Sequence, residues 1–169
     1  SFGQGSMSHL AGELLRTMTK IDIVHIPYKG AGPALVDALA GHVPVYFSSI
    51  VPALPAIKHG RLRPLAVTST ARAKQLPNVP AVAETPGLKG YDATIVFAIW
   101  APAMTPPDLV ERLNAAIWQV IQTPQFRERL ANEGASEPIG GSPQRMAAAI
   151  EADMKKLAGL VRLAGLQPQ

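Results

Sequence analysis

The chain has 169 residues, enough for one ordinary domain or two small lobes with a buried core. Hydrophobic residues make up 47% and charged residues only 17%, which excludes a disordered chain, and the lack of cysteine excludes disulfide scaffolds and thiolate zinc sites. The net charge of +4 is dispersed, with no basic run interleaved with aromatics, so we expect no nucleic-acid partner.

Loops rich in glycine and serine alternate with predicted strands and helices in the first half of the chain. The opening loop GQGSMS leads into a helix over 9–20, which Ser6 or Ser8 can cap. A helix with Pro33 in its first turn ends at Gly41, and a short helix ends at Gly60. Strands are expected at 21–28, 43–50 and 62–70. This alternation predicts an α/β fold with a parallel-type sheet flanked by helices.

The second half follows a crossing at 71–91 that is rich in proline and glycine, with one short helical turn at 79–84. Strands are expected at 93–103 and 135–141, with Trp100 and Trp118 in the core. Helices are expected at 106–122, 123–134 and 142–165, the last capped by Ser142. The crossing is the expected boundary between two lobes, 1–90 and 91–169.

The opening loop resembles a dinucleotide-binding sequence, because Gly3, Gly5 and Ser8 have the spacing of G-x-G-x-x-G with serine in the last position. Such a site needs a preceding strand and an acidic residue at the end of the second strand. Asp22 lies at the beginning of that strand, and Tyr28 and Lys29 occupy the place of the acid. A dinucleotide-dependent enzyme is therefore the weaker hypothesis.

Three loops of the same chemistry, GQGSMS, YKGAGP and FSSIVP, each precede a predicted helix. Helix N-termini present unpaired N–H groups and attract carboxylates, so the loops together can form an anion-binding site. The alternative is that the serines only cap helices and the glycines only turn the chain. Tyr28 can contact a ligand through its ring or through its hydroxyl, and the sequence does not choose between them. Neither a catalytic serine motif nor a metal-ligand spacing is present, and the four histidines are expected to be packed or solvated.

The ordered motifs GQGSMSHLAGELL, IDIVHIPYKGAGPALVDALAGHV, PALPAIKHGRLRPLAVTSTAR, LPNVPAVAETPGLKGYD and APAMTPPDLVERLNAAI together resemble the Bug family, the substrate-binding proteins of tripartite tricarboxylate transporters. The resemblance covers essentially the whole chain. It implies a type II periplasmic-binding-protein-like fold, a small carboxylate ligand, a membrane permease as partner and export to the periplasm. It also implies a protein that is not an enzyme and that needs no cofactor or metal.

The resemblance also implies which residues contact the ligand. In the third loop the chain departs from the family, because Pro44 and Ser48 stand where relatives commonly carry acidic residues. The expected ligand-binding residues are Gly5, Ser6, Ser8, Tyr28, Lys29, Gly30, Gly32, Ser48 and Ser49.

Members of the family are about twice as long, and this chain matches their C-terminal part. The resemblance therefore implies one complete ligand-binding lobe, 1–90, and the C-terminal portion of the other lobe, 91–169. Apolar faces of the second portion would then be exposed, so we expect the truncated chain to self-associate.

Overall fold

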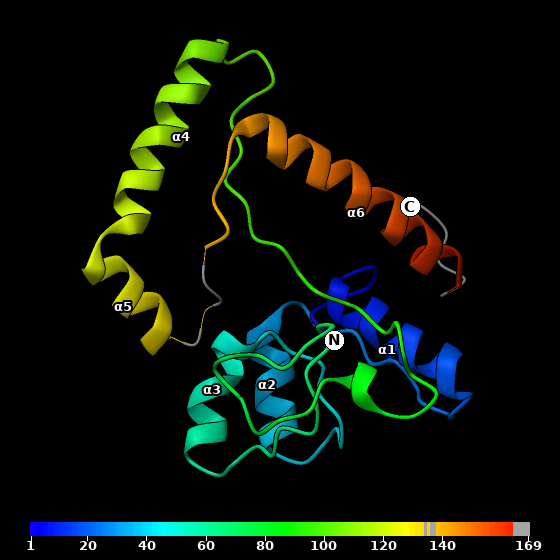
Figure 1. The fold of residues 1–169 in the computed structure, drawn as a ribbon. Coiled ribbons are helices and arrows are strands. Elements are labelled where there is room, and N and C mark those ends of the chain that lie inside the picture. The colour runs from blue at the N-terminus through cyan, green and yellow to red at the C-terminus, as the bar shows by residue number, and fades with distance from the viewer. Residues whose placement is uncertain (134, 136–137, 164–169) are drawn as a thin grey trace. The chain divides into compact units, whose positions relative to one another are not determined.

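The computed structural model describes residues 1–133, 135 and 138–163. Contacts divide the chain into two compact units, one of Ser1–Ile95 with the described part of Gly159–Gln169, and one of Val96–Ala158. Figure 1 shows the elements of each unit along the chain. The ends of the helices expected to reach Gly134 and Gly165, and residues 136 and 137 of the strand expected at 135–141, lie outside the described residues.

The first unit begins with helix α1, Met7–Thr19. Ser6 caps its N-terminus, and Lys20 ends it in the left-handed conformation with φ of 59°. The face that carries Leu10 and Leu14 is buried. The expected helix is thus confirmed, and Ser6 is its cap.

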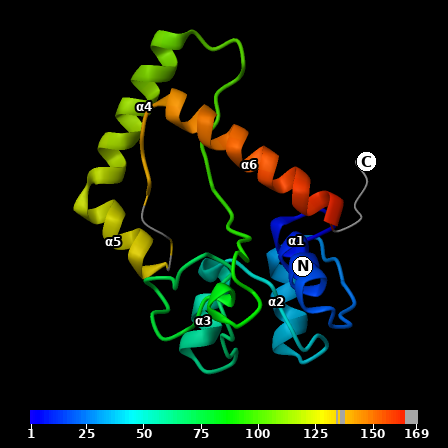
Figure 2. The ribbon, with the colours of Figure 1, turned by 45° about the vertical axis from the view of Figure 1, so that its right-hand side comes forward.

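Helices α2, Ala31–Leu39, and α3, Ile50–Lys58, pack against each other in the same unit. Both are visible in the views of Figures 1 and 2. Helix α2 buries Ala34 completely, and α3 buries Ala53 and Leu54. A 3-10 turn, η1, follows at Val82–Glu84, within the segment where a short helical turn is expected.

The strands expected at 21–28, 43–50, 62–70 and 93–103 are not formed, and the pairing among the described residues is a single parallel bridge between Val67 and Ala81. Alternating apolar residues favour an extended chain, but a strand also needs a neighbour about 4.8 Å away that completes its hydrogen bonds. In the first of these segments Val24 is 84% exposed, and Ile21 and Ile26 are 44% and 47% exposed, so its apolar side chains are only partly covered.

Short pairings nevertheless tie the crossing to the first unit. The amide of Val67 donates to Pro80 O and the amide of Val82 donates to Val67 O, each at 2.9 Å. Val67, Val79 and Ala81 form a small buried cluster. Tyr91 is fully buried and its hydroxyl donates to Ala11 O in α1 at 2.8 Å.

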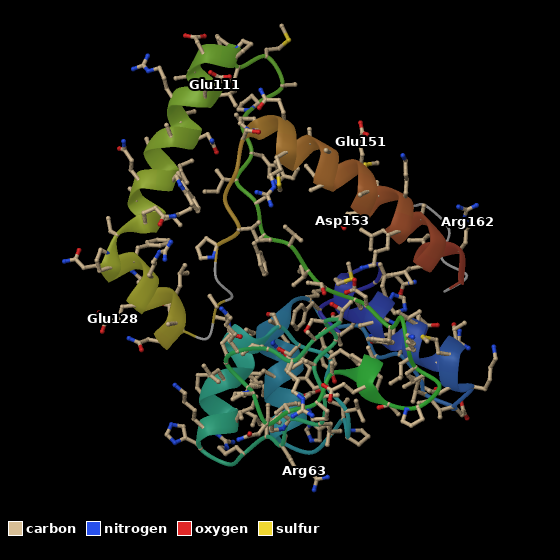
Figure 3. The ribbon with its side chains drawn as sticks, in the orientation of Figure 1. Arg63, Glu111, Glu128, Glu151, Asp153 and Arg162 are labelled. Carbon is tan, nitrogen blue, oxygen red and sulfur yellow. The ribbon has the colours of Figure 1, made fainter. Side chains whose placement is uncertain are left out.

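The second unit contains α4, Pro107–Gln122, and α5, Pro124–Asn132. Thr123 joins them: it ends α4, and its hydroxyl oxygen accepts from the amide of Phe126 at the start of α5. The chain bends at this residue, as Figures 1 and 2 show. The acidic side chains of Glu111 on α4 and Glu128 on α5 are exposed (Figure 3).

Helix α6, Pro143–Leu163, begins as expected after Ser142, whose hydroxyl accepts from the amide of Arg145 at 3.2 Å. The expectation that Trp100 lies in the core is wrong, because its side chain is 69% exposed. It belongs to an exposed apolar segment with Phe97, at 79%, and Met104, at 93%.

Candidate functional site

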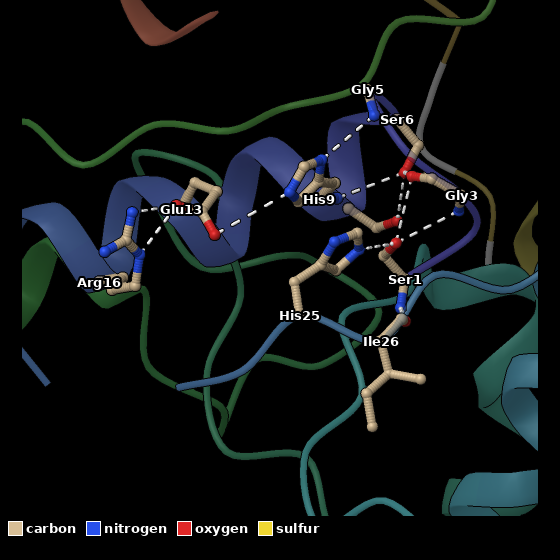
Figure 4. Close-up of polar contacts among 10 residues, drawn as sticks. Ser1, Gly3, Gly5, Ser6, His9, Glu13, Arg16, His25 and Ile26 are labelled. Atoms are coloured by element: carbon tan, nitrogen blue, oxygen red, sulfur yellow. Dashed lines mark hydrogen bonds and ion pairs between the residues drawn. The ribbon is translucent and has the colours of Figure 1, made fainter. Parts of the chain in front are cut away.

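The opening loop is held by hydrogen bonds among its own residues (Figure 4). Ser6 Oγ donates to Gly3 O at 2.7 Å and accepts from the amide of His9 at 3.3 Å. Gly5 has φ of 71°, in the left-handed region that favours glycine, and its amide donates to His9 Nδ1 at 3.1 Å. The Gly5 amide is thus committed to this loop.

Ser8 completes the network of the opening loop. Its Oγ accepts from the amide of Phe2 and lies 2.9 Å from Ser6 Oγ. Because Ser6 gives its single hydroxyl proton to Gly3 O, Ser8 is the donor in the contact between the two serines. The first amides of α1, those of Met7 and Ser8, have no partner inside the helix and are the donors that this loop can offer an anion.

The second loop lies directly against the opening loop. The amide of Gly30 donates to Phe2 O and the amide of Tyr28 donates to Ser1 O, both at 3.1 Å. Gly30 is the N-cap of α2 with φ of 108°, a conformation that a side chain would strain. Lys29, between Tyr28 and Gly30 in the sequence, is exposed. Gly32 lies inside α2 and not in the loop, because the helix begins at Ala31.

The third loop joins the other two through Tyr46. Its hydroxyl donates to Ala31 O in the first turn of α2 at 3.1 Å. Its ring meets that of Phe2 edge-on, with centroids 6.0 Å apart. The structure therefore brings together the three loops that sequence spacing selected.

The two serines of the third loop differ in their bonding. Ser48 Oγ donates to Ser49 O at 2.8 Å. Ser49 is the N-cap residue of α3, but its side chain makes no capping hydrogen bond. Ser6 thus caps its helix with its side chain, whereas Ser49 does not.

The Tyr28 hydroxyl donates to Asp37 Oδ2 on α2 at 2.8 Å. This hydrogen bond lowers the pKa of Asp37 and raises the pKa of Tyr28. His42 Nδ1 lies 3.3 Å from the other oxygen of Asp37 and also lowers its pKa. The proton of the Tyr28 hydroxyl is therefore already donated to a carboxylate within the protein.

Phe2, Asp37 and Tyr46 contact the three loops, and the sequence interpretation did not single them out. Asp37 lies nine residues after Tyr28, across a loop and a helix, so no local spacing pairs them. Phe2 and Tyr46 are aromatic residues beside glycine- and serine-rich loops, which is the signal that could have singled them out.

Metal coordination has no candidate among the described residues, since no group of three or more His, Cys, Asp or Glu side chains comes together there. Within the same residues, none of the helices has the length and apolar character needed to cross a membrane.

Comparison with protein families gives a match over residues 1–166 to the family described as the tripartite tricarboxylate transporter family receptor, TctC. The chain belongs to the TctC family. The resemblance expected from the sequence motifs is thereby confirmed.

Curated relatives of the TctC family agree with this assignment. The chain is 37% identical to a protein encoded between clcB and clcD of Pseudomonas knackmussii, over 85% of each chain. It is also 37% identical to protein BugT of Bordetella pertussis, over 95% of this chain and 49% of BugT. The chain thus spans about half the length of BugT and of the other curated relatives that it matches, the first excepted.

Solved structures show the fold of the family. Rpa4515 of R. palustris, solved with adipate, superposes with a TM-score of 0.84 at 35% identity, over 98% of this chain and 55% of that one. MatC from Rhodopseudomonas palustris, with bound malate, gives a TM-score of 0.72 at 28% identity, over 95% of this chain and 54% of MatC. BugD, a periplasmic binding protein, gives a TM-score of 0.77 at 28% identity, over 98% of this chain and 55% of BugD. The expected type II periplasmic-binding-protein-like fold is confirmed, although the described residues do not complete its sheet.

Proposed function

We propose that this protein is a periplasmic receptor that captures a small carboxylate for a tripartite tricarboxylate-type transporter. The observation that carries the proposal is the convergence of three loops, each at the N-terminus of a helix, through contacts among Phe2, Gly30, Ala31 and Tyr46. Membership of a receptor family and solved relatives with adipate and malate support a carboxylate as the ligand.

The chemistry of these loops suits an anion. The amides of Met7 and Ser8 begin α1, and the N-termini of α2 and α3 supply further backbone donors and partial positive charge. Lys29 adds an exposed positive charge at the second loop. The Ser49 side chain, which caps nothing, supplies a neutral hydroxyl donor.

In this proposal residues 1–90 form a ligand-binding lobe. The residues expected at or beside its ligand are Gly5, Ser6, Ser8, Tyr28, Lys29, Gly30, Gly32, Ser48 and Ser49. Residues 91–169 are proposed as the C-terminal portion of the other lobe. Gly5, Ser6 and Ser8 act by shaping the opening loop, and Gly32 acts as part of the first turn of α2. In this proposal the protein catalyses no reaction, and membrane permease subunits take over the ligand.

A thermal-shift comparison of adipate and malate with NAD and NADP tests this function. A ligand at a hundredfold excess over its Kd stabilises the folded state by about 2.7 kcal/mol. We expect a carboxylate to raise Tm and the dinucleotides to leave it unchanged. Stabilisation by a dinucleotide and by no carboxylate would contradict the proposal.

Two lysine variants test whether the carboxylate binds at the second loop. Lys29→Gln removes the charge from the second loop, whereas Lys58→Gln removes one from the last turn of α3, and both positions are exposed. We expect the carboxylate-dependent rise in Tm to shrink in Lys29→Gln only. An equal loss in both variants would mean that net charge, and not the second loop, attracts the ligand.

A further inference from the structure

Two histidines stack beneath the opening loop, one from α1 and one from the segment that follows it. The rings of His9 and His25 have centroids 3.6 Å apart and are inclined by only 12°. His9 is buried, with 5% of its surface exposed. Figure 4 shows the pair between the loop and the side chain of Glu13.

The hydrogen bonds of His9 fix its neutral tautomer. An amide N–H is always a donor, so His9 Nδ1, which accepts from Gly5, carries no proton. The ring proton is therefore on Nε2, which faces Glu13 Oε1 at 3.9 Å. A second proton on Nδ1 would point at the Gly5 amide and remove its acceptor.

The charged and titratable groups around the pair come from three segments. Glu13 on α1 raises the pKa of His9, but this carboxylate is already bound by Arg16 at 2.6 Å. The amine of Ser1 lies on the other side and lowers the pKa of both rings. Burial is the largest influence on each ring and lowers the pKa of His9 and of His25.

A charge on His9 also disfavours a charge on His25. Stacked imidazoles leave no room for an anion between them, and His9 lowers the pKa of His25. Ser1 Oγ lies within hydrogen-bond distance of His25 Nε2 and accepts from the amide of Gly3 at 3.2 Å. The neutral pair thus contacts the opening loop at two places, Gly5 and Ser1.

We infer that His9 is a positioning residue that holds the opening loop only in its neutral form, and that protonation of the histidine pair releases the loop and weakens ligand capture as the pH falls. This inference rests on the proposed function, since it assumes that the opening loop contacts the ligand. A histidine that served packing alone would use its ring faces and would not need Nδ1 as an acceptor for the loop.

Replacement of His9 by asparagine and by glutamine separates a role in holding the loop from a role in packing alone. An asparagine places its oxygen near the position of Nδ1, whereas a glutamine places its amide near the position of Nε2. The affinity for adipate is measured by calorimetry between about pH 8 and about pH 4, because burial moves the titration of both rings below the ordinary histidine range. His59→Asn is the matched control, since His59 is exposed after α3 and far along the chain from the loop.

We expect the affinity of the unmodified chain to fall about tenfold across this range, which corresponds to about 1.4 kcal/mol. Once the affinities are corrected for protonation of adipate itself, His9→Asn keeps its affinity at every pH, His9→Gln binds weakly at every pH, and His59→Asn follows the unmodified chain. N-terminal acetylation removes the charge of the Ser1 amine, and we expect the affinity for adipate to decrease with falling pH as it does in the unmodified chain. A pH-independent affinity of the unmodified chain, or an unchanged fall in His9→Asn, would overturn the inference.

A measurement without ligand covers the case in which the variants do not fold. The ¹⁵N shift of His9 Nδ1 and the hydrogen-exchange rate of the Gly5 amide are followed by NMR during titration of the unmodified chain. We expect the protection factor of this amide, which is its intrinsic exchange rate divided by the measured rate, to fall at the same pH at which Nδ1 gains its proton. A constant protection factor through that titration would contradict the role of His9. A coupled change, with no carboxylate bound at any pH, would instead contradict the proposed function alone.

Discussion

The hydroxyl of Tyr28 donates to Asp37 Oδ2 at 2.8 Å, and this bond joins the second loop to the middle of α2. The sequence left open whether Tyr28 meets a ligand through its ring or its hydroxyl. Since the proton of the hydroxyl is donated to a carboxylate within the protein, we expect a ligand to contact the ring of Tyr28 and not its hydroxyl.

Tyr28→Phe is therefore expected to change the affinity for adipate by less than about threefold, because the phenyl ring remains and no donor to the ligand is lost. Calorimetry measures the affinity. In the same variant the pKa of Asp37 should rise towards its ordinary value, since the hydrogen bond that lowers it most has gone. A large loss of affinity would show that Tyr28 turns its hydroxyl from Asp37 to the ligand.

Two N-cap serines are expected to differ on substitution. Ser6→Ala removes a capping hydrogen bond and should lower the free energy of unfolding by about 1 kcal/mol. Ser49→Ala removes a side chain that makes no capping bond, so it should leave stability nearly unchanged and weaken carboxylate binding. Urea unfolding and calorimetry on both variants check this contrast. Equal destabilisation by the two substitutions would contradict it.

Acid should weaken the crossing segment through Glu84. Its carboxylate accepts from Arg72 at 2.7 and 2.9 Å and from the amide of Ala81 at 2.8 Å, and these bonds lower its pKa to about 2. A carboxyl group with a lowered folded pKa stabilises the protein above its unfolded pKa, and this contribution disappears as the pH falls through the folded value. Stability should therefore decrease between about pH 4.5 and about pH 2.

Arg72→Gln tests this source of acid sensitivity. With the arginine gone, the pKa of Glu84 should return part of the way towards its ordinary value, and the decrease below about pH 4.5 should be shallower. Urea unfolding at several pH values measures the slope. Arg61→Gln is a suitable control, because Arg61 is also exposed and no ion pair is described for it.

The exposed apolar segment of the second unit should cause self-association. Phe97, Ile99 and Trp100 expose 79%, 76% and 69% of their surfaces, and contiguous apolar patches of this kind usually mark an interface. Light scattering should give a mass that rises with concentration, and Phe97→Ser combined with Trp100→Ser should reduce it. A monomer over a wide concentration range would show that this expectation is wrong.

Much of the helical part of the fold could be predicted from sequence because its signals are local. The Ser6 cap, Pro107 and Pro143 at helix starts, and Gly41 after a helix end lie next to the residues that they affect. Strands could not be predicted in the same way. The 21–28 segment has strand-forming residues, but its pairing depends on distant neighbours that the pattern does not specify.

The loops of the candidate site could also be predicted from local sequence, whereas the hydrogen bonds within the site could not. Glycines and serines before helices marked the three loops, and the structure brings these loops together. The sequence did not show which donors are already used, because the bond from Gly5 to His9 and the bond from Tyr28 to Asp37 depend on side-chain positions. Resemblance to a family selected the same loops without showing that two serine hydroxyls of the opening loop bond to each other.

The buried hydroxyl of Tyr91 has a consequence for the order in which the chain folds. It bonds to Ala11, eighty residues earlier, so α1 receives this contact only after Tyr91 has left the ribosome. Until then the helix can form its own backbone bonds, but part of its apolar surface is open to chaperones and to neighbouring chains. Closing a loop of this length is entropically costly, which makes the contact a late event in folding. Translation pauses placed before Tyr91 has left the ribosome should therefore prolong chaperone binding, whereas pauses placed after it has left should not.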